Sequence, residues 1–346
     1  AGRDGGAPQV RAGIPALFAA VLAVAGATVQ STARSPAPVN DAAVLTGMPR
    51  ALSEYGFFAD LGEQWGTYGV SSYRLNTPLY SDGADKLRFV YTPSGKQFTA
   101  AGDGLLQFPV GSALIKTFAF GVGEERQLIE TRVLLRRESG WVALPYRWNA
   151  EQTDATLTLA GARVPLKRPD GSQISYRIPN MNQCKTCHHK DGEVIPIGPK
   201  ARNLSAEWLA LEEQVGALQS MPQVDVRLPV WEARDEASLN TAARAYLDVN
   251  CAHCHQPGGS ASNSGLDLRW EQDDPHAIGI RKPPVAAGRG AGGFAISIDP
   301  GAPDTSIMVH RMNSTESGVA MPELGKATVD TEGLDIVSRW IAEMDQ

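Results

Sequence analysis

Cys251-Ala252-His253-Cys254-His255 is a C-x-x-C-H pentapeptide, and Cys184-Lys185-Thr186-Cys187-His188 repeats the pattern upstream. This is the spacing at which a c-type haem is attached covalently. Two nearby thiols reach the two vinyl groups on one edge of the porphyrin, and the histidine that follows binds the iron. The motifs contain all four cysteines of the chain. We therefore expect two covalently bound haem c groups, attached through Cys184, Cys187, Cys251 and Cys254 and bound axially by His188 and His255.

Two other kinds of site use paired cysteines. The two C-x-x-C pairs could together form a four-thiolate zinc site, and one pair could be a thioredoxin-like redox dithiol. A histidine directly after both pairs is not expected by chance in a chain of 346 residues with only six histidines. A redox dithiol also needs a βαβ context, which neither pair shows. Haem attachment is the preferred interpretation, and a shared zinc site is the main alternative.

The composition is that of an ordinary soluble protein, with 42% hydrophobic and 20% charged residues. The chain is long enough for two or three domains, each with its own core. Its formal net charge is −6. A negative charge argues against nucleic acid as a partner and is compatible with a basic redox protein.

The beginning of the chain resembles an export signal. Arg3 and Arg11 precede an apolar run over residues 14–27 that ends in small residues, and this pattern predicts a secretory signal peptide over residues 1–27. The run is shorter than the roughly 20 residues that a membrane span needs, so no stable span is expected, and a retained anchor is the alternative. We expect a periplasmic or other extracytoplasmic location. Residues 28–50, polar and proline-rich, are predicted to be a linker.

Residues 51–175 carry a β pattern and contain neither histidine nor cysteine. Short runs of β-branched and aromatic residues alternate with Gly, Pro, Asp and Ser clusters, which predicts an antiparallel, sandwich-like domain without a haem of its own. The expected strands lie at residues 87–91, 113–120, 128–135, 141–144 and 156–159.

The remaining chain carries the two motifs, and we expect two mainly α haem domains. Residues 176–235 are predicted to form a minimal cytochrome c-like domain, in which the backbone carbonyl of Pro199 could bind the proximal imidazole. Residues 236–346 are predicted to form a class I cytochrome c-like domain with a helix over 239–249 and a terminal helix. The predicted fold class is therefore α+β multidomain, with a β-rich domain followed by two haem domains.

The second haem needs a sixth ligand, and Met321, in a loop before the terminal helix, is the preferred candidate. Its rivals are Met308, Met312 and His310. For the first haem the sequence does not choose among Met181, Met221, His276, His310 and an open position. His253 is expected at the surface or rim of its site. The haem propionates could bind Arg281, Lys282 or Arg289, which lie in or beside a Gly- and Pro-rich stretch.

Several stretches resemble the exported di-haem c-type cytochromes often encoded beside parallel β-helix repeat proteins. These stretches are Leu75-Asn76-Thr77-Pro78-Leu79-Tyr80-Ser81-Asp82, Gln183-Cys184-Lys185, Gly198-Pro199-Lys200, Tyr246-Leu247-Asp248-Val249-Asn250-Cys251-Ala252-His253-Cys254-His255 and Met321-Pro322-Glu323-Leu324-Gly325. The resemblance covers nearly all of the chain after residue 50. It implies electron transfer, and it implies Met321 as the distal ligand of the second haem.

We therefore expect an electron carrier with no catalytic residues of its own. Its expected partners are redox proteins, with a neighbouring β-helix repeat protein as a further candidate. The alternative is a haem enzyme, either a di-haem peroxidase or the redox subunit of a dehydrogenase, with an open first haem as the reactive centre.

Overall fold

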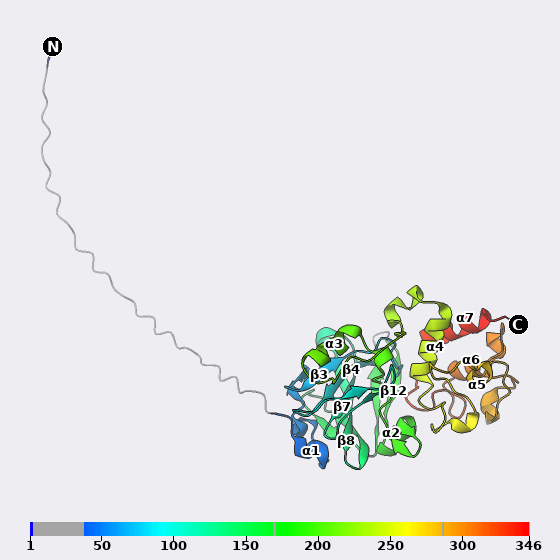
Figure 1. Ribbon diagram of the computed structural model, residues 1–346, viewed down its shortest axis with the longest axis horizontal. Coiled ribbons are helices and arrows are strands. Elements are labelled where there is room, and N and C mark those ends of the chain that lie inside the picture. The colour runs from blue at the N-terminus through cyan, green and yellow to red at the C-terminus, as the bar shows by residue number, and fades with distance from the viewer. Residues whose placement is uncertain (3–37, 169–170, 286, 346) are drawn as a thin grey trace. The chain divides into compact units, whose positions relative to one another are not determined.

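A six-stranded antiparallel sheet is the largest element of the computed structural model, which describes residues 1–2, 38–168, 171–285 and 287–345. The strand order is β10-β9-β8-β7-β4-β3, so that successive long strands lie side by side (Figure 1). These strands overlap all five predicted runs, and that prediction is confirmed. Their bounds are β3 (Val70–Tyr73), β4 (Asp85–Tyr91), β7 (Ala113–Phe120), β8 (Gln127–Arg137), β9 (Gly140–Trp148) and β10 (Ala155–Leu157).

The other strands of the described chain form two-stranded ribbons. The ribbons are β1 (Phe58–Asp60) with β2 (Trp65–Gly66), β5 (Thr99–Ala100) with β6 (Leu106–Gln107), β11 (Ala162–Lys167) with β12 (Gln173–Ile178), and β13 (His189–Lys190) with β14 (Glu193–Val194). The α-helices are α1 (Asp41–Leu45), α2 (Met181–His188), α3 (Ala206–Gln214), α4 (Leu239–Asn250), α5 (Pro275–Ile278), α6 (Ile307–Met312) and α7 (Thr331–Ala342). Short 3-10 turns are η1 (Leu52–Tyr55), η2 (Gly123–Glu125), η3 (Ala201–Asn203), η4 (Trp231–Glu236), η5 (Ser262–Ser264), η6 (Gly288–Ala291) and η7 (Pro303–Thr305).

The predicted fold class, α+β multidomain with two mainly α haem domains, is wrong. The structure is β-rich and 27% helical, and only four helices of the described chain have seven or more residues. Those four are α2, α3, α4 and α7. The predicted sandwich would need a second large sheet packed on the first, and the described residues form no such sheet. Long loops and 3-10 turns occupy the regions where helical domains were expected, because the Gly and Pro residues there interrupt helices.

One face of the sheet packs against the first described residues of the chain. Side chains alternate between the two faces of a strand, and Phe89, Ile115 and Val133 point to the face covered by α1 and η1. Val44 of α1 and Tyr55 of η1 are fully buried there.

The linker predicted over residues 28–50 is therefore wrong for residues 38–50. Val39, Ala43 and Val44 are buried in the sheet's core, and the Tyr91 hydroxyl donates to Asp41 Oδ1 at 2.7 Å. The predicted signal peptide, residues 1–27, falls almost wholly on residues 3–37, which lie outside the described chain. Among the helices that are described, none is long and apolar enough to cross a membrane.

The opposite face of the sheet carries the first cysteine motif. Val90, Leu114 and Leu134 form one apolar core with Cys184 of α2 and Leu209 of α3. Because strand and helix residues share this core, the boundary predicted at residue 175 does not separate two cores. The first motif is built directly onto the sheet.

The second motif belongs to a core formed by α4 and α7. Leu247 of α4 and Val337 and Ile341 of α7 are fully buried together. Asp330 caps α7, accepting a hydrogen bond from Gly333 N at 3.1 Å. The helix predicted over residues 239–249 and the predicted terminal helix are confirmed.

The segment over residues 75–82 joins the sheet to both motif-bearing regions. Thr77 N donates to Asn203 Oδ1 at 2.8 Å, just before α3. Tyr80 N donates to Asn250 Oδ1, also at 2.8 Å, at the end of α4. Asp82 accepts hydrogen bonds from the backbone N–H groups of Ala327 and Thr328 at 2.6 and 3.0 Å. This segment fixes the two motifs in one framework.

A buried carboxylate makes a second connection between the two regions. Asp248 of α4 is 2% exposed. Its Oδ1 accepts from Lys200 Nζ at 2.7 Å and from Trp270 N at 3.0 Å, and its Oδ2 lies 3.7 Å from Arg202 Nε.

Replacing Asp248 by Ala is expected to lower the free energy of unfolding by about 3–5 kcal/mol, because it leaves the largely buried Lys200 ammonium without its carboxylate, whereas Arg202 keeps its pairs with Asp103 and Glu271. Chemical denaturation measures this loss. Asp335→Ala is the control, since Asp335 makes an exposed i,i+4 pair with Arg339 worth about 0.5 kcal/mol. Equal losses in the two variants would contradict a structural role for the buried pair.

Candidate functional site

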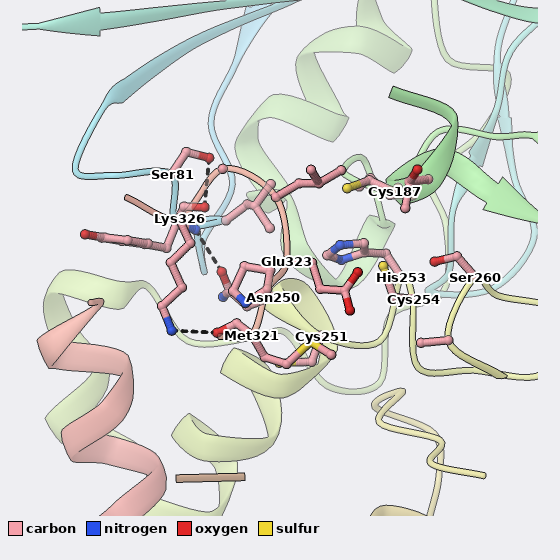
Figure 2. A pocket seen from close by; sticks show the side chains of 18 of the residues that line it. Ser81, Cys187, Asn250, Cys251, His253, Cys254, Ser260, Met321, Glu323 and Lys326 are labelled. Atoms are coloured by element: carbon pink, nitrogen blue, oxygen red, sulfur yellow. Dashed lines mark hydrogen bonds between the residues drawn. The ribbon is translucent and has the colours of Figure 1, made fainter. Parts of the chain in front are cut away.

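Both cysteine motifs line a single cavity of about 380 Å³. Its wall contains all four cysteines together with His188, His253, His255 and Met321. Figure 2 shows Cys187, His253 and Cys254 close together, with Cys251 beside Met321. The two motifs, 67 residues apart in sequence by their first cysteines (251 − 184 = 67), thus form one site.

Helix α2 presents the first motif to the cavity. Asn180 Oδ1 accepts from Gln183 N at 2.8 Å, and Gln183 Oε1 accepts from Asn180 N at 3.0 Å, so a capping box begins the helix. Cys184, Cys187 and His188 stand at positions i, i+3 and i+4, which share one helix face. Sequence reasoning missed this helix, although the Asn-x-x-Gln capping pattern could have indicated it.

The second motif follows the end of α4 in tight turns. Cys254 N and His255 N both donate to Cys251 O, at 3.1 and 3.0 Å. These turns bring both thiols and the imidazole to the same wall of the cavity.

The two motif histidines are in the form that binds a metal through Nε2. His188 Nδ1 lies 2.7 Å from Ile195 O, and a carbonyl only accepts, so Nδ1 carries the proton. His255 Nδ1 lies 2.9 Å from Ser264 Oγ, whose own hydrogen goes to Ala261 O; Nδ1 is again the donor. Each Nε2 therefore keeps a free lone pair, and each ring orientation is fixed by its Nδ1 hydrogen bond.

Burial keeps both imidazoles neutral. Desolvation, with a smaller contribution from Lys116, lowers the pKa of His188 to about 3. Desolvation, with a smaller contribution from His253, lowers the pKa of His255 to about 4. A neutral imidazole is the form that binds metals, so each of these histidines can bind a metal ion through Nε2.

The motifs meet at Cys187, His253 and Cys254, whose ligand atoms all lie within 4.8 Å of one another. The hydrogen bond between the two thiols, together with burial, raises the pKa of Cys187 to about 12, and the same bond lowers the pKa of Cys254. His253 was expected at the surface or rim, but it is only 9% exposed, and its Nδ1 has no hydrogen-bond partner among the described residues. That expectation is wrong, because the first motif covers the second.

The sheet supplies a row of cations to the cavity wall. Arg88, Lys116 and Arg132 stand directly opposite one another on β4, β7 and β8, and the last two line the cavity. Arg132 Nε pairs with Glu130 at 2.9 Å. Lys116 Nζ makes no hydrogen bond to a described residue and lies 5.2 Å from the Phe118 ring centroid. Burial lowers the pKa of Lys116 to about 7.

Met321 is held in the wall by the Lys326 ammonium, which donates to Met321 O at 2.7 Å (Figure 2). The same ammonium also contacts Met312 O. Met321 lines a second cavity of about 100 Å³ as well, together with Cys251, His255 and its rivals Met308 and Met312. His310, its other rival, lines neither cavity.

None of the residues proposed as the sixth ligand of the first haem is among those that line the larger cavity. Met221 and His276 are exposed, and Met181 packs against the core on the far face of the sheet. His310 contacts the Phe294 ring instead.

Four other residues named from the sequence make contacts different from those expected. Pro199 O accepts from Leu106 N at 2.9 Å, so Ile195 rather than Pro199 binds the proximal imidazole. The propionate candidates Arg281 and Lys282 donate to the backbone oxygens of Asp345 and Gly265, and Arg289 pairs with Glu316.

Comparisons of the chain with protein-family models, with curated proteins and with solved structures gave no match.

Proposed function

We propose that this chain is a di-haem c-type cytochrome that transfers electrons outside the cytoplasm. The observation that carries the proposal is the shared cavity wall. There, each C-x-x-C-H histidine is neutral, fixed through Nδ1 and free at Nε2, beside two thiols of its own motif. The resemblance to exported di-haem cytochromes encoded beside β-helix repeat proteins supports it. Redox proteins, and such a repeat protein, are the proposed partners.

When bound, haem supplies one-electron chemistry by cycling between ferric and ferrous iron. The chain supplies the rest. Cys184, Cys187, Cys251 and Cys254 would form the thioethers, His188 and His255 would bind the irons, and Met321 is proposed to complete the second site. Cys187 and Cys254 are in direct contact, so these residues would hold the two haems next to each other, as a carrier that relays electrons requires.

Maturation in a host that attaches c-type haem tests the proposal. We expect two haems per chain by pyridine haemochrome assay, and a colour that acidified acetone does not extract. A colourless product, or a colour lost to acidified acetone, would overturn it.

A second candidate function, a di-haem peroxidase or the redox subunit of a dehydrogenase, is favoured by one observation. The residues considered as sixth ligands of the first haem lie away from the cavity, which is compatible with an open coordination position there. An EPR spectrum separates the two functions. Two low-spin haems support a carrier, whereas one high-spin haem that binds cyanide supports the enzyme.

The cation row is expected to raise the potential of the first haem, because positive charge disfavours the ferric state. Lys116→Met should therefore lower that midpoint potential, by the order of tens of millivolts. Spectroelectrochemical titration at pH 6, where Lys116 is protonated, measures the shift. Lys96→Met removes an exposed lysine and should change neither potential. A higher midpoint potential in Lys116→Met, or equal shifts of the potential in both variants, would contradict an influence of the cation row on the first haem.

A further inference from the structure

Cys187, His253 and Cys254 form a ligand set that the haem function does not explain as a set. Each donor atom lies within 4.8 Å of the other two. Among the described residues, these three form the one such group of cysteine, histidine or carboxylate side chains. Cys187 and Cys254 are proposed haem-attachment residues of different motifs. His253 is neither an attachment cysteine nor a proposed iron ligand.

His253 is the observation that points to a ligand. Its side chain is more than nine-tenths buried and lines the cavity, where it hydrogen-bonds the Cys187 thiol. Its Nδ1 has no partner among the described residues. A buried nitrogen without a hydrogen bond costs free energy, so its retention at this place needs a reason. A metal ion is a natural partner for an imidazole nitrogen beside two thiols.

The geometry is close to what zinc requires. Donor atoms on a tetrahedral zinc lie roughly 3.3–3.8 Å apart for Zn–N and Zn–S bonds of about 2.0–2.3 Å. Atoms within 4.8 Å of one another therefore need to close by at most about 1.5 Å to reach that geometry. Glu323 lines the same cavity (Figure 2) but is not part of the group, which leaves the fourth position to water.

We propose that the chain without haem binds one soft divalent cation, of which Zn²⁺ is the type, at Cys187, His253 and Cys254. Binding breaks the two S–H bonds, forms two metal–thiolate bonds and one metal–imidazole bond, and releases two protons. The site and the haems exclude each other, because a cysteine sulfur in a thioether is no longer a thiolate donor. One ion thus occupies one attachment cysteine from each motif and blocks both attachments at once.

This inference does not rest on the proposed haem function, since it concerns the unloaded chain. It also differs from a four-thiolate site, because Cys184 lies in the sheet core and Cys251 beside Met321, outside the group.

Full-length apoprotein, made in a host that cannot attach haem and purified under reducing conditions, tests the proposal with Zn²⁺ and Co²⁺ as probes. We expect one ion per chain, a thiolate-to-cobalt charge-transfer band, and protection of two of the four thiols from alkylation. Peptide mapping should place that protection at Cys187 and Cys254.

The zinc affinities of single variants test which residues bind the ion. Cys187→Ala, Cys254→Ala and His253→Ala should each weaken zinc binding by at least about 100-fold, because loss of a ligand exceeds the 10–100-fold cost of losing an outer hydrogen bond. His253→Cys, which keeps a ligand, should restore most of it. His276→Ala removes an exposed imidazole and should change nothing. Metal-free circular dichroism checks that each variant folds.

Other patterns overturn the proposal. If Cys184→Ala and Cys251→Ala also weaken zinc binding, the site is a four-thiolate site. If His253→Ala does not weaken zinc binding, the ion binds adventitiously to thiols. Haem content of matured protein is measured separately, so failure of the metal site and failure of the cytochrome function are distinguishable.

Discussion

Cys251→Ala/Cys254→Ala is expected to contain one haem per chain where the unaltered protein is expected to contain two. Both thiols of the second motif are removed, so no thioether can form there, whereas the first motif keeps its own cysteines on α2. The first motif is anchored independently, through the Asn180 capping box and the packing of Cys184 against the sheet. Intact-mass measurement and pyridine haemochrome assay count the haems.

The matched control is the reciprocal variant, Cys184→Ala/Cys187→Ala, which should also keep one haem. The two variants should differ in spectrum, because Met321 lies with Cys251 and His255 in the second site. Two haems retained in either variant, or none in both, would contradict independent attachment at the two motifs.

Met321→Ala is expected to convert the second haem from low-spin to high-spin, because the proposed thioether ligand is lost. Met321→His should keep it low-spin and lower its midpoint potential by a sizeable part of the roughly 0.8 V that axial ligands span, since a thioether favours the ferrous state more than imidazole does. EPR spectra and a redox titration measure both effects.

Met308→Leu and Met312→Leu are the controls, since both residues line the smaller cavity beside Cys251 and His255. Neither should alter the spin state of the second haem. If one of them, and not Met321, produces the high-spin signal, that methionine is the distal ligand. Lys326→Met should leave the spin state low but broaden the spectrum, because the Met321 loop loses its anchor.

Local sequence patterns were sufficient to predict those helices and strands whose formation depends mainly on neighbouring residues. Every predicted run of β-branched and aromatic residues became a strand of the sheet, and the apolar periodicity of residues 239–249 became α4. The same patterns did not predict how these elements are arranged into domains. Two helices flanking a motif suggested mainly α domains, but Gly- and Pro-rich sequence between them forms loops, and the first motif is supported by the sheet.

The C-x-x-C-H spacing by itself determined which side chains we propose as the haem-binding groups, because two thiols and an imidazole within five residues are close whatever the fold. Only the tertiary structure decided that both motifs share one cavity, that Ile195 and Ser264 fix the imidazoles, and that His253 is buried between two cysteines. Those contacts join residues far apart in the chain. Their formation depends on how the segment over residues 75–82 and the sheet pack the two motifs together, and no local sequence pattern encodes that packing.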